Sequence, residues 1–260
     1  CFTIEYATWF RIILPGMQRL RLAVPLGGTT LFFRRDILEA LGGWDAHNVT
    51  EDADLGFRLA RHGWQAGIIA PGTLEEAPVR LKAWTAQRSR WLKGHAISWA
   101  VQMREPGALR REAGLGGFAA LQASLGANAL SATVHAPALV LIAGLLIASM
   151  VSATPPLVLI PALAGYGAAM LVAWTGARRA GFSPRLRDLM ALPAYWLLQF
   201  PAMIRALREI AGAPYFWAKT DHAVTARART APDEPYADAH PYGGHGAGLR
   251  LVRVAQRQAV

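Results

Sequence analysis

Residues 113–177 read AGLGGFAALQASLGANALSATVHAPALVLIAGLLIASMVSATPPLVLIPALAGYGAAMLVAWTGA and contain no Asp, Glu, Lys or Arg. A chain that faced water over this length would carry charges. The interior of a bilayer excludes charges, because each one costs about 2.5–3.5 kcal/mol at the centre of an inserted helix. This stretch therefore predicts membrane helices.

The charged residues lie on the two sides of this stretch. Residues 1–112 hold 15 basic and 11 acidic residues, and residues 178–260 hold 12 and 6, so the net charge of +10 divides into +4 and +6. Nucleic-acid binding is the simple interpretation of a basic chain, but a positive excess beside apolar segments instead indicates membrane orientation. The single cysteine, Cys1, excludes an internal disulfide framework and a cysteine-rich zinc site.

Two apolar blocks, 113–151 and 157–177, flank a turn at 152–156. Arginines stand at both outer ends of this pair, so the positive-inside rule predicts cytoplasmic ends and a multi-pass protein of the inner membrane. A third block, 189–204, is at the lower limit of length for a span. Either it lies in the interface, or the block 113–151 crosses twice around His135-Ala136-Pro137.

The polar part predicts an α/β arrangement of short elements. Capping residues, glycines and apolar runs predict loop and strand over 1–33, a short helix over 37–41, a helix over 50–63, a strand over 66–70 and a long helix over 79–104. We divide the chain into a cytoplasmic part at 1–112, membrane helices at 113–210 and a cytoplasmic or interfacial tail at 211–260.

Thr50-Glu51-Asp52 begins the helix predicted over 50–63. A carboxylate at a helix N-terminus, after the loop Gly42-Gly43-Trp44-Asp45, can face a cleft and take a proton from an attacking hydroxyl. Ordinary capping of the first turn is the alternative interpretation.

Gln87-Arg88-Ser89-Arg90-Trp91 lies on the long helix. A guanidinium on a rigid helix can bind phosphate in a bidentate way, and an indole can stack on a sugar ring. We place Gln87 and Trp91 on one face with Trp84, Arg90 at its edge and Arg88 pointing away. A helix that packs its tryptophans in a core and leaves its arginines in water is the alternative.

Thr50-Glu51-Asp52, 34 intervening residues, the Gln-x-x-Arg-Trp motif and then apolar helices together resemble the family 2 processive glycosyltransferases, such as the cellulose, hyaluronan and chitin synthases. The resemblance covers about residues 5–222 and is most specific over 24–94. It implies the C-terminal part of a GT-A-like α/β domain followed by transmembrane helices. It also implies inverting transfer from a nucleotide-sugar donor to a glycan or lipid acceptor, with no role for nucleic acid.

The resemblance also implies roles for individual residues. Asp52 is the expected general base. Gln87, Arg90 and Trp91 are expected at the donor diphosphate and the acceptor end. The remaining expected substrate contacts are Gly28 and Thr29 in a loop with Gly27, then Thr50, Glu51, Trp217 and Lys219. The last two belong to a segment similar to the family's Trp-x-Lys-Thr-x-His motif, which continues through Thr220 and His222. That motif has an acidic residue where this chain has Ala218.

The resemblance implies Mg²⁺ or Mn²⁺ on the donor diphosphate, held by an Asp-x-Asp motif. No such motif precedes Thr50, and Asp52-Ala53-Asp54 lies inside the base motif, so we assign no metal ligand in this chain. We expect the ligands before Cys1, and we expect this chain alone not to turn over.

Exopolysaccharide synthesis is the function that the sequence favours. The first rival is a non-processive enzyme that glycosylates a lipid or polyprenyl phosphate. The second is a non-catalytic membrane subunit that binds a glycan.

Overall fold

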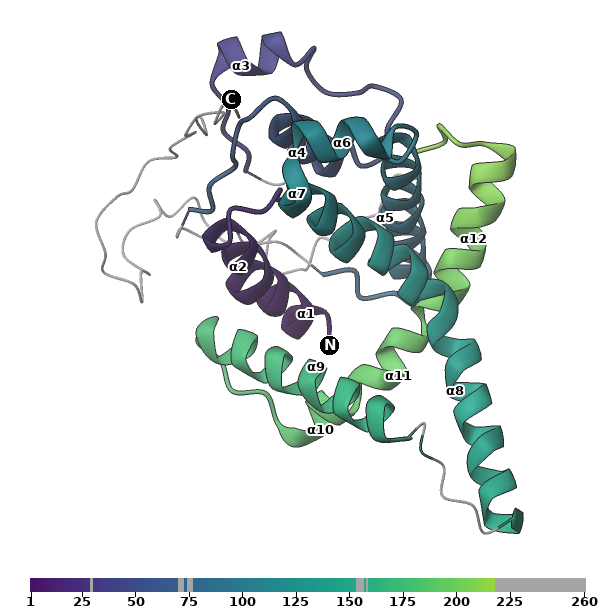
Figure 1. Cartoon of the computed structure of the whole chain (residues 1–260). Coiled ribbons are helices and arrows are strands. Elements are labelled where there is room, and N and C mark those ends of the chain that lie inside the picture. Colours follow the sequence, from purple (N-terminus) through teal and green to yellow (C-terminus); the bar gives the residue numbers. More distant parts are fainter. Residues whose placement is uncertain (29, 70–72, 74–76, 153–156, 158, 218–260) are drawn as a thin grey trace.

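This computed structural model describes residues 1–28, 30–69, 73, 77–152, 157 and 159–217, whose regular secondary structure is helical, with loops and extended segments between the helices (Figure 1). The helices in chain order are α1 (Phe2–Thr8), η1 (Trp9–Ile13), α2 (Leu14–Arg19), α3 (Arg35–Ala40), α4 (Glu51–Arg61), α5 (Leu81–Gln102), α6 (Pro106–Glu112), α7 (Gly114–Leu121), η2 (Gln122–Gly126), α8 (Ala127–Ser152), α9 (Leu159–Arg179), α10 (Leu186–Met190), α11 (Leu192–Leu197) and α12 (Gln199–Gly212).

The N-terminal region is a helix from Phe2 to Arg19, so our prediction of loop and strand over residues 1–33 is wrong for its first half. The prediction places a break at Pro15-Gly16, because proline lacks the N–H that an α-helix needs and its ring crowds the preceding turn. Here the preceding turn, Trp9–Ile13, is a π-helix, whose wider turn accommodates an irregularity of this kind. The helix therefore continues through Pro15.

The described residues contain no β-strand element, so the predicted α/β class is not confirmed. Neither strand candidate, 31–33 or 66–70, forms one where it is described. Instead, extended chain around Val24 packs directly on α4. A Cβ placed on Gly56 would lie 2.2 Å from the Val24 carbonyl oxygen, so glycine is what permits this approach.

The helix α5 is the centre of the molecule. The helices α4, α8 and α12 all pack on it. One side of this region is an apolar core in which Phe57 of α4, Leu109 of α6 and Leu121 of α7 are fully buried. On the other side Leu92 of α5 packs with Met203 and Ala206 of α12. Side chains from widely separated parts of the sequence are thereby brought to one helix.

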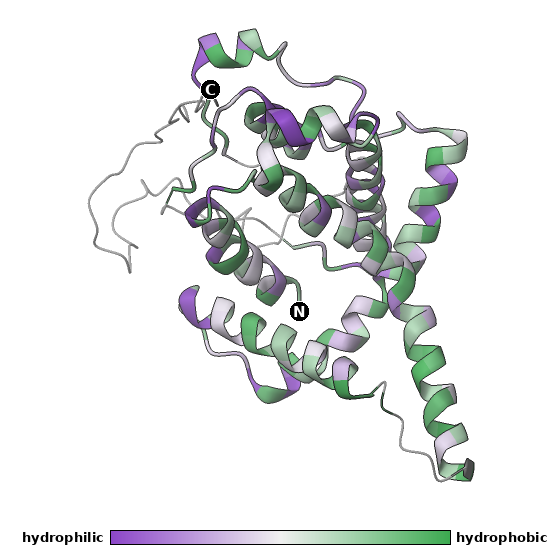
Figure 2. Cartoon of the chain, in the orientation of Figure 1, coloured by the Kyte–Doolittle hydropathy of each residue, from purple (hydrophilic) through white to green (hydrophobic). Residues whose placement is uncertain are grey.

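The uncharged stretch forms two long helices. One runs from Gly114 to Val151 through α7, η2 and α8, and the other is α9; both are long and apolar enough to cross a membrane. Leu121 and Leu125, near the start of the first helix, are buried in the core, whereas most of the large side chains of its last turns are exposed. Figure 2 shows that these last turns are hydrophobic. Because the helix is continuous, it does not cross twice around His135-Ala136-Pro137.

The third apolar block does not form a single long helix. It is divided among α10, α11 and the first turns of α12, and none of these has the length of a span. This arrangement favours the interfacial alternative. The helix α9 instead packs on the N-terminal helix, where a Cβ on Gly176 would lie 2.7 Å from the Cα of Thr8.

Candidate functional site

Asp52 lies in the first turn of α4, where unpaired backbone N–H groups favour a carboxylate. Its Oδ1 accepts a hydrogen bond from the Ala53 N–H at 2.8 Å. Burial, reinforced by the charge of Glu51, raises the pKa of Asp52 to about 6, against the opposing effects of the Ala53 N–H and the Arg90 charge. A carboxyl group with this pKa is suited to general-base catalysis near neutral pH.

The glycine loop lies against this carboxylate. A Cβ on Gly28 would come within 3.1 Å of Asp52 Oδ2, so a larger residue here would crowd the proposed base. Thr29 lies outside the described residues. Thr30, which follows it, has a φ of 60°, a left-handed conformation that is rare for a β-branched residue. Backbone strain of this kind is found at functional sites.

The Thr50 end of α4 is fixed to α5. Thr50 is buried, and its N–H donates to Asn48 Oδ1 at 3.0 Å. The Asn48 amide in turn donates to Ser98 Oγ of α5 at 2.9 Å. A Cβ on Gly94 would lie 2.2 Å from Thr50 Oγ1, so α5 and the start of α4 are in direct contact. Thr50 therefore positions Asp52, and Glu51 contributes negative charge beside it.

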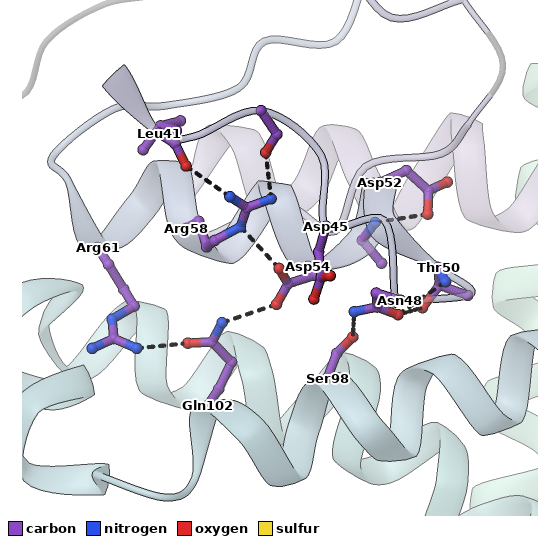
Figure 3. Close-up of polar contacts among 12 residues, drawn as sticks. Leu41, Asp45, Asn48, Thr50, Asp52, Asp54, Arg58, Arg61, Ser98 and Gln102 are labelled. Carbon is purple, nitrogen blue, oxygen red and sulfur yellow. Dashed lines mark hydrogen bonds and ion pairs between the residues drawn. The ribbon is translucent and has the colours of Figure 1, made fainter. Parts of the chain in front are cut away.

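A second set of polar contacts holds α4 through Asp54 and Arg58, one and two turns after Thr50 (Figure 3). Asp54 Oδ2 accepts from Arg58 at 2.9 Å, and its Oδ1 accepts from Gln102 of α5 at 3.1 Å. Arg58 also donates to the carbonyl oxygens of Leu41 and Gly43, at 2.8 and 2.7 Å. The glycine turn, α4 and α5 thus form one unit. The spacing i to i+4 of Asp54 and Arg58 is visible in the sequence, but the partner Gln102 is not.

Arg90 lies on the side of α5 next to the loop before α4, and Gln87 is buried three residues earlier on the same helix. Arg90 Nη1 is 3.4 Å from the Val49 carbonyl oxygen. Burial lowers the pKa of the Arg90 guanidinium, and the carboxylates of Asp52 and Glu51 oppose that effect. Gln87 Oε1 and Arg90 Nε are buried without a hydrogen-bond partner among the described residues. Arg88 Nε is a third such atom, and all three are exceptions to the rule that buried polar atoms are satisfied.

Arg88 does not point away from the tryptophans, which corrects our prediction. It is buried on the face of Trp84 and Trp91, with its guanidinium carbon 5.3 and 4.7 Å from their ring centroids. Residues four and three apart share a helix face, so the sequence arithmetic itself places Arg88 between these rings. Arg88 forms a bidentate pair with Glu5 at 2.6 and 2.5 Å, and Tyr195 hydrogen-bonds to both.

The aromatic residues of the site are partly open. Trp91 is half-buried and packs on Tyr6, with the ring centroids 6.3 Å apart. Trp217 is 57% exposed, and its ring lies 5.6 Å from the Arg90 guanidinium carbon. The structure thus brings together Gly28, Asp52, Arg90 and Trp217. Lys219, Thr220 and His222 lie outside the described residues.

A cavity of about 490 Å³ lies between α8, α9 and α11. Its walls include His135, Tyr166 and Trp196, whose rings are in mutual contact. Asn128 and Gln199 add hydrogen-bonding groups. Glu5 also lines the cavity. Its ion-pair partner Arg88 lies over the ring of Trp91.

No group of three His, Cys, Asp or Glu side chains among the described residues is placed to hold a metal ion. The donor set therefore does not fit the cation that the resemblance implies. What the described residues can do is accept a proton at Asp52, bind an anion at Arg90 and offer an aromatic surface at Trp91.

Comparison with protein families matches residues 3–177 to the family described as Glycosyl transferase family group 2. The beta-monoglucosyldiacylglycerol synthase of Synechocystis is 38% identical over 85 residues, which are 32% of this chain and 16% of that protein. The cellulose synthase catalytic subunit [UDP-forming] of Komagataeibacter sucrofermentans is 35% identical over 68 residues, which are 26% of this chain and 9% of that protein.

Other relatives include a probable glucomannan 4-beta-mannosyltransferase of Arabidopsis thaliana, 37% identical over 70 residues, which are 26% of this chain and 13% of that protein. In these relatives the matched segment spans less than a fifth of the whole protein. No solved structure matches the chain significantly.

Proposed function

Because the chain belongs to Glycosyl transferase family group 2, we propose that it is part of an enzyme that transfers a sugar from a nucleoside diphosphate donor to a growing glycan. The transfer inverts the anomeric carbon and takes place at the inner membrane, where the product is an exopolysaccharide. The observation that carries this proposal is the position of Asp52. Its pKa is raised, it lies next to Gly28, and it interacts with the charge of Arg90.

Asp52 acts as the general base in this proposal. It removes the proton from the acceptor hydroxyl as that oxygen attacks the anomeric carbon, and the diphosphate leaves from the opposite side. A pKa of about 6 leaves the carboxylate mostly ionised at neutral pH and still basic enough to accept the proton. The buried position beside Gly28 brings the acceptor to the carboxylate.

Arg90 and Gln87 bind the donor. The guanidinium carries a fixed positive charge toward the leaving diphosphate, and bidentate contact to phosphate is a geometry that arginine supplies and lysine does not. The unpartnered oxygen of Gln87 accepts a hydrogen bond from a hydroxyl of a sugar or ribose. The divalent cation is part of the proposal and would neutralise charge on the diphosphate. The described residues hold no group of three His, Cys, Asp or Glu side chains that would bind it.

The two apolar helices support a membrane location. The exposed side chains of α8 carry no charge and most of them are apolar, which is the composition that a bilayer interior favours. The aromatic cavity between α8, α9 and α11 has the chemistry of a saccharide site, with ring faces and a few hydrogen-bonding groups. This cavity could hold the part of a growing glycan that extends from Trp91 toward the membrane helices.

A lipid acceptor is the second candidate, and the name of a relative favours it. The Synechocystis protein is a beta-monoglucosyldiacylglycerol synthase, which places a glycolipid among the products of similar proteins. Membrane vesicles that contain the full-length protein and a labelled nucleotide sugar separate the two. Label that precipitates as polymer supports glycan synthesis, whereas label that is extracted as lipid with one added sugar supports the second candidate.

Asp52→Asn in the same vesicles tests whether the protein is an enzyme at all. A general base contributes about 10²- to 10⁴-fold to rate, so we expect at least a hundredfold loss. Unchanged transfer in the Asp52→Asn variant would leave the chain as a non-catalytic, glycan-binding subunit.

A further inference from the structure

Residues 213–217 form a short segment, here called the strap, that follows α12 and crosses beside the site. The strap has little burial of its own, because Tyr215, Phe216 and Trp217 are 69%, 54% and 57% exposed. An exposed aromatic segment is not held in place by the hydrophobic effect. Its position therefore depends on a few specific contacts.

The strongest of these contacts comes from Lys93. Its ammonium group is completely buried, and Nζ donates to the Phe216 carbonyl oxygen at 2.5 Å and to Glu209 Oε2 at 3.0 Å. A buried ammonium is stable only when it is paired in this way. Burial would raise the pKa of Glu209, but hydrogen bonds from Arg205 and Lys93 outweigh it, so the pKa of Glu209 is lowered and its carboxylate is ionised. One lysine thus joins the end of α12 and the backbone of the strap to α5.

The contacts on each side of Phe216 reach the site itself. Trp217 lies against the Arg90 guanidinium, with 5.6 Å between the guanidinium carbon and the ring centroid. Tyr215 meets His47 edge to face at 5.4 Å, in the loop that precedes Thr50. Arg90 and Lys93 are three residues apart and so are neighbours on the surface of α5. The strap therefore contacts adjacent positions of one helix, one with its backbone and one with a ring.

We propose that Lys93 is a positioning residue that holds the strap across Arg90 and thereby sets how tightly the donor is bound. The proposal rests on the proposed function, since it treats Arg90 as the donor clamp. Lys93 touches neither donor nor acceptor and acts only through the Phe216 carbonyl and Trp217. Trp217, held over the guanidinium, covers its apolar face and leaves its N–H edge for phosphate.

The experiment uses the full-length protein in membrane vesicles and in detergent, with Lys93→Met as the main variant. We expect the donor KM to rise on the order of tenfold with a smaller change in kcat, the effect of losing a charge-assisted contact. Hydrogen exchange should become faster in the peptide that covers 209–217 and stay unchanged in α4. Lys82→Met is the matched control, because Lys82 is exposed on the same helix; it should change neither quantity.

A double-mutant cycle separates positioning from a general packing role. If Lys93 acts through Trp217, Lys93→Met should add little to the donor KM of a Trp217→Ala variant. Independent, additive effects would overturn the proposal. Should Lys93→Met fold poorly because Glu209 keeps only Arg205 as a partner, the double variant Lys93→Met/Glu209→Met removes both charges of the pair and still releases the strap.

The exchange measurement also separates this proposal from the proposed function. A wild-type protein without transferase activity would refute the function, and faster exchange in 209–217 would still show the tether. Wild-type donor KM and wild-type exchange in a folded Lys93→Met variant would refute the role of Lys93.

Discussion

The helices α5 and α8 place their side chains in opposite ways. α5 buries polar groups, namely Gln87, Arg88, Ser89, Lys93, Ser98 and Gln102. α8 carries no charge and leaves its large apolar groups outside; Met150 and Val151 are 86% and 87% exposed (Figure 2). The first helix is arranged around a polar interior, and the second is arranged for apolar surroundings.

The difference shows how the site is built. Burial of a polar group is costly unless it is paired. Four of the polar groups of α5 find partners on the N-terminal helix, on α4 with the loop before it, and on α12, through Glu5, Asn48, Asp54 and Glu209. These partners come from distant parts of the sequence, so α5 gathers the chain around Arg90. The exposed apolar surface of α8 has no such specific partners among the described residues and carries no such information.

The largest effect that would test this comparison is at Asp52. Asp52→Asn removes the charge, and we expect at least a hundredfold loss of transfer. Because the folded protein raises the pKa of this carboxyl group to about 6, the ionised form is disfavoured in the fold. Asn should therefore raise the midpoint of thermal unfolding at pH 8, and this gain should shrink as the pH falls through 6 and disappear only below the ordinary carboxyl pKa of 3.8.

The wild-type enzyme gives the matching pH profile. Transfer should fall on the acid side with an apparent pKa near 6, because protonated Asp52 cannot act as a base. A profile that is flat down to pH 5, or an Asn variant that is less stable at pH 8, would contradict the assignment of Asp52.

The second largest expected effect concerns the ion pair between Arg88 of α5 and Glu5 of the N-terminal helix. Arg88→Met leaves Glu5 partly buried and without its partner, and removing one member of a buried pair costs about 3–5 kcal/mol of folding free energy. Denaturant unfolding in detergent measures the change. Arg80→Met, at the exposed start of the same helix, is the control and should stay within about 0.5 kcal/mol. Equal losses of folding free energy in the two variants would mean that the buried pair of Arg88 and Glu5 does not stabilise the fold.

The sequence predicted α4 and α5 nearly to their ends. Thr50 before three acidic residues and Gly63 after the last basic ones are local signals, and Gly63 has the left-handed φ of 78° expected at a helix end. The uncharged stretch likewise predicted the two long helices. Such signals depend on a residue and its near neighbours, which is why sequence is enough to find them.

The N-terminal helix and the setting of Arg88 were predicted wrongly. The first depended on a π-turn ahead of Pro15, which no residue pattern announced. The second was an error in helix geometry, and the partner Glu5 is 83 residues away in the chain. The strands expected for an α/β class did not appear among the described residues, because extended chain near Val24 packs on α4 instead of pairing with another strand.

The comparison can also be tested from the side of α8. Leu141 is 62% exposed, so Leu141→Ala should have little effect on packing. Leu141→Arg, however, should cost about 2.5–3.5 kcal/mol if this turn lies in a bilayer, and less protein should be recovered in the membrane fraction. Leu115→Arg, at the exposed start of α7 beside the polar part, should be tolerated better. Equal recovery of the two arginine variants would argue against a bilayer around α8.

The smallest effect concerns the aromatic surface at Trp91. Arg88 covers part of this ring, at 4.7 Å from its centroid, and Tyr6 packs beside it, so the indole is held rigidly but remains half-exposed. A sugar that stacks on the free part gains contact without ordering a mobile side chain. Trp91→Ala should therefore raise the acceptor KM or shorten the product by about two- to tenfold, the range expected from about 0.5–1.5 kcal/mol of ring contact.

Donor hydrolysis without acceptor should change much less in Trp91→Ala, because the lost surface touches only the acceptor. Trp91→Phe should recover part of the effect, since an aromatic face is what stacking requires. Trp84→Phe is the control: Trp84 is buried and donates to the Tyr195 hydroxyl at 3.0 Å, so its loss should lower stability and leave the acceptor KM unchanged. If Trp91→Ala instead lowers polymer yield and donor hydrolysis equally, then Trp91 is a packing residue of α5 like Trp84. In that case the acceptor must be held by another surface, of which the rings around the cavity between α8 and α9 are the next to test.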